Sequence, residues 1–135
     1  MSSPPRPVPD PDVAGAPFWE AAARHELVLQ TCSSCGTIRH PPRPMCAVCN
    51  SMEYTFEQAS GHGRIWSWVI AHAPVLPSFA EKVPYNVVMV ELDEGVRMVG
   101  NLFDIDNDAI TEGMLVTVDF EDIEDGVSLP VWRPQ

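Results

Sequence analysis

The sequence has no long apolar run, few basic residues and no glycine-rich phosphate loop. No stretch approaches the ~18 apolar residues of a membrane-spanning helix, so none is expected. Residues 1–17 contain no apolar signal-peptide core, which favours a soluble cytoplasmic protein. Only 8 Lys and Arg stand against 19 Asp and Glu. Because nucleic-acid affinity comes largely from Lys and Arg, this balance argues against a nucleic-acid partner.

The acidic residues lie mainly in the second part of the chain. Residues 1–55 carry four basic and five acidic residues, whereas residues 56–135 carry four basic and fourteen acidic ones. A solvated acidic surface that keeps the protein in solution explains this asymmetry. The length of 135 residues fits one ordinary domain or two very small ones.

The N-terminal part divides into a leader and a helix. Residues 1–15 are rich in proline and poor in large apolar groups, which predicts a disordered leader or a linker. Residues 16–28, APFWEAAARHELV, are predicted as a helix with Pro17 in its first turn. The predicted domains are this leader, a helix with a cysteine segment over 16–55, and a β domain over 56–135.

The second half of the chain has the pattern of short β-strands. Val116, Val118 and Phe120 alternate with polar residues, as in a half-buried strand. The apolar run over 86–90, NVVMV, predicts a central strand covered on both faces. Five short strands separated by turn signals predict a small barrel, and they are 63–70, 85–92, 97–103, 114–121 and 128–134.

All four cysteines lie in two Cys-x-x-Cys pairs, at positions 32, 35, 46 and 49. Two residues between cysteines allow one tight turn to aim both sulfurs at a common point, and a second turn completes a tetrahedron. Zn²⁺ suits four thiolates, and a site with its coordination filled has a structural role. The spacing therefore predicts a metal site formed by Cys32, Cys35, Cys46 and Cys49.

Other interpretations of the cysteines stay open at this point. Iron in a rubredoxin-type site uses the same ligand set. A thioredoxin-like redox motif needs a βαβ context, which the sequence does not show. Disulfides are the least favoured, because a cytoplasmic protein is kept reduced.

Two apolar segments are candidates for a partner surface. Phe18 and Trp19 are adjacent on the predicted helix, so they cannot both face the same side, and we expect them to dock either on the core of this chain or on a partner. The loop 71–84 is long, broken by prolines and apolar at Val75, Leu76 and Phe79. Because an apolar loop is costly to expose, we expect it to contact a partner; the alternative is that it folds back over the mouth of the barrel.

Catalytic patterns are weak. None of His25, His40, His62 and His72 pairs with a nucleophile in a recognisable arrangement, although His40 could donate to the metal ligands. We therefore expect no catalytic residue. Cofactor-binding residues remain unknown, and any phosphates of coenzyme A would need the basic residues Arg39, Arg43, Arg64 or Lys82.

The order of these motifs resembles a known family. PFWEAAARHELVLQTCSSCGTIRHPPRPMCAVCNS, then SGHGRIWSWVI, PYNVVMVELDEGVRMVGNLF, EGMLVTVDFED and LPVWRP, is similar to the DUF35 family of acyl-CoA-associated proteins. The resemblance covers nearly everything after residue 15. It implies a rubredoxin-like zinc ribbon followed by an OB-fold, with the family's four zinc ligands falling on the four cysteines.

The resemblance also implies an accessory function. Such proteins partner thiolase-like enzymes, which carry the catalytic residues, and this chain looks most similar to the domain that accompanies a steroid side-chain aldolase. The expected complex performs retro-aldol cleavage of a steroid acyl-CoA thioester, with a hot-dog-fold hydratase as a further partner. The chain would stabilise its partner and shape the coenzyme A channel. Alternatives are a subunit of a thiolase or hydroxymethylglutaryl-CoA synthase, a nucleic-acid-binding module, or a free-standing enzyme acting on CoA thioesters.

Overall fold

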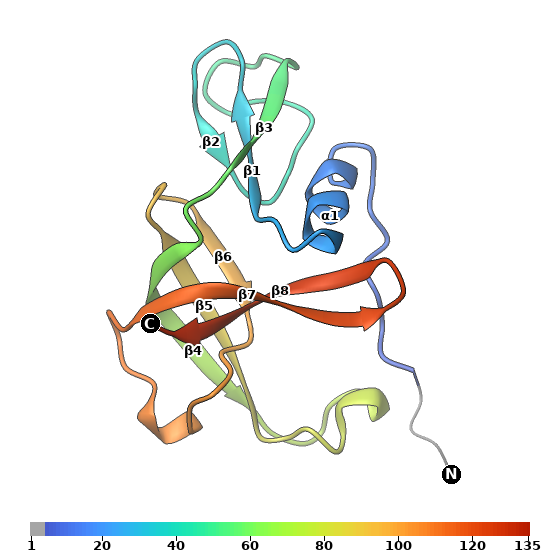
Figure 1. The fold of residues 1–135 in the computed structure, drawn as a ribbon, viewed down its shortest axis with the longest axis vertical. Helices are drawn as coiled ribbons and strands as arrows, with labels where there is room; N and C mark the ends of the chain where they lie inside the picture. The colour runs from blue at the N-terminus through green and yellow to red at the C-terminus, as the bar shows by residue number, and fades with distance from the viewer. Residues whose placement is uncertain (1–4) are drawn as a thin grey trace.

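The computed structural model describes residues 5–135 and shows a mostly β protein with one α-helix, a small ribbon and a barrel below it (Figure 1). This architecture confirms the predicted fold class. Two short 3₁₀ helices lie in the barrel loops, at Pro77–Phe79 and Asn107–Ala109. The α-helix and strands are α1 (Ala16–Ala23), β1 (Val28–Cys32), β2 (Ile38–Arg39), β3 (Tyr54–Gln58), β4 (His62–Ala71), β5 (Tyr85–Leu92), β6 (Arg97–Gly100), β7 (Leu115–Glu124) and β8 (Val127–Pro134).

Helix α1 ends earlier than predicted, at Ala23 rather than at residue 28. His25 takes a left-handed conformation with φ 61°, and its N–H donates to the carbonyl of Ala22 at 2.8 Å. The N–H of Glu26 then donates to the carbonyl of Ala21 at 3.0 Å. These two bonds form a Schellman motif, which ends a helix and is usually made by glycine. The prediction was wrong here because histidine is not a recognised helix stop.

The ribbon is a three-stranded antiparallel sheet with the order β2-β1-β3. Strand β1, of which the helix prediction included only the first residue, pairs with β3 from Val28 opposite Gln58 to Cys32 opposite Tyr54. Strand β3 therefore spans the boundary predicted after residue 55. We propose that the change from ribbon to barrel follows Gln58.

The barrel is a five-stranded antiparallel sheet with the order β6-β5-β4-β7-β8, which curls until its end strands meet. The N–H of Phe103 donates to the carbonyl of Trp132 at 2.8 Å, and the N–H of Trp132 donates to the carbonyl of Asn101 at 2.9 Å. These bonds connect the segment after β6 with β8, so the barrel is nearly closed and leaves few open edges.

One core joins the ribbon, the helix and the barrel. Trp132 is fully buried at its centre, and Phe18 of α1 and Leu29 of β1 belong to the same cluster as Ile65 and Val88 of the barrel. Because the parts share buried surface, their relative position is held by the hydrophobic effect.

Strand β5 is covered on one face only, which corrects the prediction of a strand buried on both. Its residues alternate between buried and half-buried along the whole strand. Val88 and Val90 point into the barrel, whereas Val87 and Met89 face outward. A small barrel has one interior, so an apolar residue at an outward position stays partly exposed.

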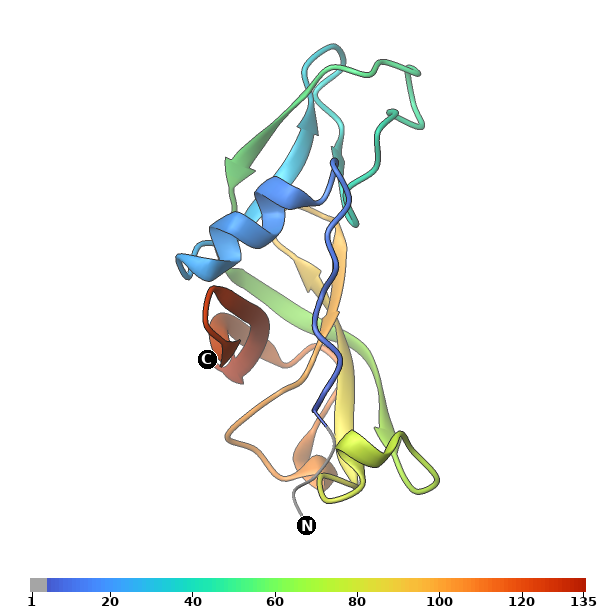
Figure 2. The same ribbon diagram turned by 90° about the vertical axis from the view of Figure 1, so that its right-hand side faces the viewer.

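The leader from residue 5 to residue 15 has no helix or strand and runs along the side of the molecule (Figure 2). Arg6 Nη1 donates to Glu121 Oε1 of β7 at 2.7 Å, and Ala14 is buried beside the helix. Residues 1–4 of the predicted disordered leader lie outside the described residues.

Candidate functional site

The two Cys-x-x-Cys turns have the same backbone geometry. In the first, the N–H of Gly36 donates to the carbonyl of Cys32 at 3.0 Å; in the second, the N–H of Asn50 donates to that of Cys46 at 2.9 Å. Both donors have a positive φ, 77° for Gly36 and 64° for Asn50. Glycine and asparagine adopt this conformation most readily, which is why they follow the second cysteine of each turn.

The two turns bring the four cysteine sulfurs together, with all four Sγ atoms within 4.8 Å of one another. The Sγ atoms of Cys32 and Cys49 lie 3.6 Å apart, and those of Cys35 and Cys46 lie 3.7 Å apart. Sulfurs at ~2.3 Å from one Zn²⁺ would lie about 3.8 Å apart along the edges of a tetrahedron, whereas a disulfide is about 2.05 Å long. The cysteines are therefore free thiols in the geometry of a four-thiolate metal site, and a disulfide framework is not formed.

Backbone donors favour the ionised form of two of these thiols. The N–H groups of Cys35 and then Ser34 lower the pKa of Cys32 to about 6. The N–H groups of Cys49 and Val48 likewise lower the pKa of Cys46. For Cys49, the Ser51 N–H acts in the same direction, but burial and the other three thiols together raise the pKa to about 12. Ionising Cys49 beside the other thiols therefore needs a cation.

The segment between the two cysteine pairs is held by two buried side chains that the sequence patterns did not reveal. Gln30 is 1% exposed and forms two hydrogen bonds with the backbone of Arg43. Its Nε2 donates to the carbonyl of Arg43 at 2.9 Å, and its Oε1 accepts from the N–H of Arg43 at 2.8 Å. Arg39 is 3% exposed and donates to the same carbonyl from Nη2 at 2.8 Å. These bonds position the proline-rich loop that closes the ribbon.

His40 lies in this loop, and no hydrogen bond joins it to a cysteine sulfur among residues 5–135. Its ring packs on Phe18 with the ring centroids 5.3 Å apart, and its Nδ1 is buried without a partner. Burial lowers the pKa of His40 to about 4, so the ring is neutral at pH 7. His40 is therefore a packing residue of the ribbon rather than a donor to the metal ligands.

We expect His40 to make stability depend on pH. Because the pKa is about 4 in the folded chain and 6.5 when unperturbed, its contribution is lost as pH falls from 6.5 towards 4. Between pH 7 and pH 5, the wild type should lose about 2 kcal/mol of unfolding free energy more than the His40→Gln variant. Urea unfolding of both proteins at both pH values measures this difference. Equal losses would show that His40 does not titrate on unfolding, since acid effects on the cysteines are common to both proteins.

The structure separates the five predicted interface residues. Phe18 is 4% exposed and belongs to the core of this chain, so its prediction as a partner contact is corrected. Adjacent helical residues face different sides, and here Phe18 is on the side of the helix that packs on the barrel. Leu76 is 58% exposed, while Trp19, Val75 and Phe79 are half-buried.

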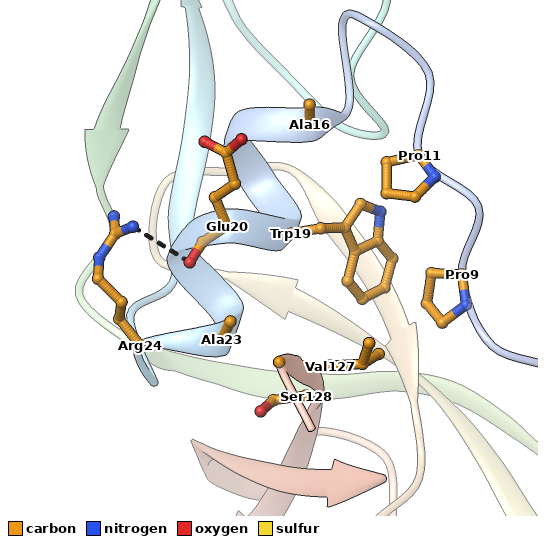
Figure 3. A pocket seen from close by; sticks show the side chains of 10 residues that line it. Pro9, Pro11, Ala16, Trp19, Glu20, Ala23, Arg24, Val127 and Ser128 are labelled. Atoms are coloured by element: carbon orange, nitrogen blue, oxygen red, sulfur yellow. Dashed lines mark hydrogen bonds between the residues drawn. The ribbon is translucent and has the colours of Figure 1, made fainter. Parts of the chain in front are cut away.

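Trp19 lies under the leader rather than on an open surface. Figure 3 shows its indole beside Pro9 and Pro11, at the edge of a pocket that the tip of the β7–β8 hairpin closes with Val127. The pocket has a volume of about 430 Å³. Trp19 therefore anchors the leader to the helix.

The outward side of strands β4, β5 and β6 carries an apolar surface that sequence reasoning missed. We call it the outer face, and its residues are Trp66, Val69, Val87, Met89 and Val99. Val69 is 61% exposed and Val99 59% exposed. The signal was the unbroken apolar run of β5, whose outward residues are too apolar for a solvated strand.

Ser128, Asp122 and His25 lie together but do not form a catalytic triad. The Ser128 hydroxyl donates to Asp122 Oδ1 at 2.5 Å, and His25 Nε2 lies 2.7 Å from the same oxygen. The carboxylate thus sits between the hydroxyl and the imidazole, whereas a triad places the imidazole next to the nucleophile.

Among residues 5–135, no helix is long and apolar enough to cross a membrane.

Comparisons with known proteins match both parts of the chain. The family model described as ChsH2, rubredoxin-like zinc ribbon domain, matches residues 19–53. The model described as ChsH2, C-terminal OB-fold domain, matches residues 56–121. A solved structure, the Ltp2-ChsH2(DUF35) aldolase, is 41% identical with a TM-score of 0.86, covering 93% of this chain and 98% of that chain.

Three curated relatives show the same likeness. The probable enoyl-CoA hydratase alpha subunit of Thermomonospora curvata is 44% identical over 96% of this chain and 40% of its own length. The 3-oxo-4,17-pregnadiene-20-carboxyl-CoA hydratase alpha subunit of Mycobacterium tuberculosis is 38% identical over 87% of this chain and 36% of its own length. A DUF35 domain-containing scaffold protein of Methanocaldococcus jannaschii is 33% identical over 77% of each chain. The chain thus spans about two fifths of the length of the two hydratase subunits.

Proposed function

Because the chain belongs to the DUF35 family, with a ChsH2-type zinc ribbon and OB-fold, we propose that it is an accessory subunit of a thiolase-like acyl-CoA aldolase. The observation that carries this proposal is the likeness to the Ltp2-ChsH2(DUF35) aldolase over 98% of the matched chain. The name of the archaeal relative, a scaffold protein, supports the same role. In this complex the partner carries the catalytic residues.

The relatives' names support a proposal for the substrate class. One relative is named a hydratase subunit for a pregnadiene carboxyl-CoA, which is a steroid thioester. We infer that the complex cleaves a steroid side-chain CoA thioester by a retro-aldol reaction, and that a hydratase is a further partner because two relatives are hydratase alpha subunits. The chain stabilises the aldolase and borders its CoA channel.

Zn²⁺ is the proposed ion of the four-cysteine site. The sulfur separations of 3.6 and 3.7 Å fit a tetrahedral ion, and four thiolates fill its coordination. The ion holds the ribbon in shape and performs no chemistry on the substrate.

Co-expression with a thiolase-like aldolase tests this function. We expect the two chains to elute together in size exclusion, and retro-aldol turnover to rise at least tenfold over the aldolase alone. This chain alone should give no turnover. Equal activity of the aldolase with and without the chain, or turnover by the chain alone, would contradict the proposal.

The partner surface is proposed at the loop after β4 and the adjoining outer face. Leu76 is 58% exposed on that loop, and burying such a side chain in an interface stabilises it by about 1.5–3 kcal/mol. Leu76→Ser should therefore weaken association at least tenfold without changing the melting temperature of the chain. The matched control is Val13→Ser, which removes an 89% exposed apolar residue from the leader. Equal co-purification of both variants with the aldolase would remove Leu76 from the interface.

A further inference from the structure

The second half of strand β4 has a neighbouring strand on one side only. Strand β4 pairs with β5 from Gly63 to Ala71, whereas its pairing with β7 ends at Arg64. Two further backbone bonds join Ile65 to the segment just before β7, and Figure 2 shows the rest of β4 at the margin of the barrel with no strand on its free side. Residues 66–71, which we call the β4 edge, are therefore an open edge in a barrel that is otherwise nearly closed.

The hydrogen-bond pattern shows which residues of the β4 edge are unpaired. The N–H of Leu92 in β5 donates to the carbonyl of Val96, towards β6. Because backbone bonds alternate between the two sides of an antiparallel strand, even-numbered residues of β5 bond to β6 and odd-numbered ones to β4. Val69 lies opposite an odd-numbered residue of β5, which leaves the N–H and C=O groups of Trp68 and Ile70 pointing away from β5. Among residues 5–135, no hydrogen bond joins these groups to another segment.

The β4 edge lacks the features that commonly keep an exposed strand from pairing with another chain. It contains no proline, and no Lys, Arg, Asp or Glu lies between Arg64 and Glu81. The bulge between Ile65 and Ser67 lies at its beginning rather than among its unpaired residues. Charged residues, prolines and bulges are the usual devices that block an edge. An apolar edge without them fits the addition of a strand from another chain.

The surroundings of the β4 edge favour a partner chain over a second copy of this chain. Val69 and Trp66 of the outer face belong to the edge itself, so an added strand would extend that face and pack its alternate side chains beside them. Arg64, next to the edge, forms no ion pair among residues 5–135. A second copy paired antiparallel would offer it no carboxylate, because the loop after its own edge has none before Glu81. It would also bring together two chains of net charge −11.

We propose that an extended segment of the aldolase partner completes the β4 edge, adding a strand that bonds to the backbone of Trp68 and Ile70. This segment carries apolar side chains at alternate positions, towards the outer face, and an acidic residue near Arg64. The inference rests on the proposed accessory function and gives its mode of association. Main-chain hydrogen bonds supply affinity, and the apolar side chains supply specificity. Leu76 lies on the loop that follows the edge, so both contacts belong to one surface.

Amide hydrogen exchange of the zinc-loaded full chain, alone and in complex with the aldolase, tests this pairing. In the isolated chain, Trp68 and Ile70 should exchange at least tenfold faster than Ser67 and Val69, whose N–H groups bond to β5. In the complex, Trp68 and Ile70 should slow at least tenfold, while Ser67 and Val69 change less than threefold.

The exchange measurement separates this inference from the function on which it rests. A complex in which Trp68 and Ile70 keep their fast exchange would overturn the strand addition and leave the accessory function standing. Absence of any complex would overturn both. A dimer of the isolated chain with protected Trp68 and Ile70 would assign the edge to a second copy and overturn the proposal.

A pair of variants at residue 70 tests the same backbone group. Ile70→Pro removes one outward N–H, at an edge position where proline is tolerated, and should weaken association with the aldolase at least tenfold. Ile70→Val is the matched control, because it also shortens this half-buried side chain but keeps the N–H, and it should weaken association less than threefold. Melting temperatures of the isolated variants show whether either loses its fold, and the exchange measurement needs neither. Equal association of two folded variants would overturn the proposal.

Discussion

Replacing Cys46 by serine is expected to abolish stoichiometric zinc binding and to unfold the ribbon. Cys46 is fully buried, and its sulfur lies 3.7 Å from that of Cys35, so serine removes one of four ligands from a closed site. Structural zinc sites of this kind contribute about 10–16 kcal/mol of apparent binding energy, which becomes folding energy where the site forms only on folding. We expect a loss on the order of 5 kcal/mol or more.

The measurement combines metal analysis with hydrogen exchange. Amides of β1 and β3 should lose their protection in Cys46→Ser, whereas those of β5 should keep theirs with a lower melting temperature, because the barrel shares its core with the ribbon. Val48→Ser is the control in the same turn, since Val48 is 71% exposed and supplies no ligand. Full ribbon protection in the metal-free Cys46→Ser protein would refute a metal-dependent ribbon.

Replacing Trp132 by alanine is expected to destabilise the barrel by about 3–5 kcal/mol, the usual cost of removing a large aromatic side chain from a core. Trp132 is fully buried in β8 and packs so closely that a Cβ built on Gly100 would lie 3.1 Å from its ring. Because Trp132 also sits where β8 meets the segment after β6, its loss leaves a cavity at the closure of the barrel.

Trp66→Ala is the matched control for this prediction. Trp66 is 45% exposed on the outer face, so its removal should cost ~1 kcal/mol or less, mainly the stacking with Arg97. Chemical denaturation of both variants gives the two free energies. Similar losses would mean that Trp132 does not hold the core as described.

Much of this fold was predictable because its signals are local. The Cys-x-x-Cys spacing reports the geometry of a single tight turn, and glycine or asparagine after the pair reports a positive φ. The alternation of Val116, Val118 and Phe120 reports a strand with one buried face. Each of these patterns depends on neighbouring residues alone, so it could be interpreted without knowing what lies across the molecule.

Other features depended on contacts between distant segments. Trp19 and Phe18 are equally apolar in sequence, but only the packing of α1 on the barrel decides that Phe18 is buried and that Trp19 contacts the leader. The end of α1 at Ala23 likewise relied on a left-handed conformation of His25, which is uncommon for any residue other than glycine.

The sequence by itself determined the four-cysteine cluster, the positions of the five barrel strands and the acidic character of the barrel, because residue type and spacing set these directly. Only the tertiary structure decided that residues 66–71 form an open edge and that five apolar residues of three strands form the outer face. The physical reason is that a strand edge or an apolar side chain acquires its function from its neighbours in space, and barrel closure brings those neighbours from remote parts of the chain.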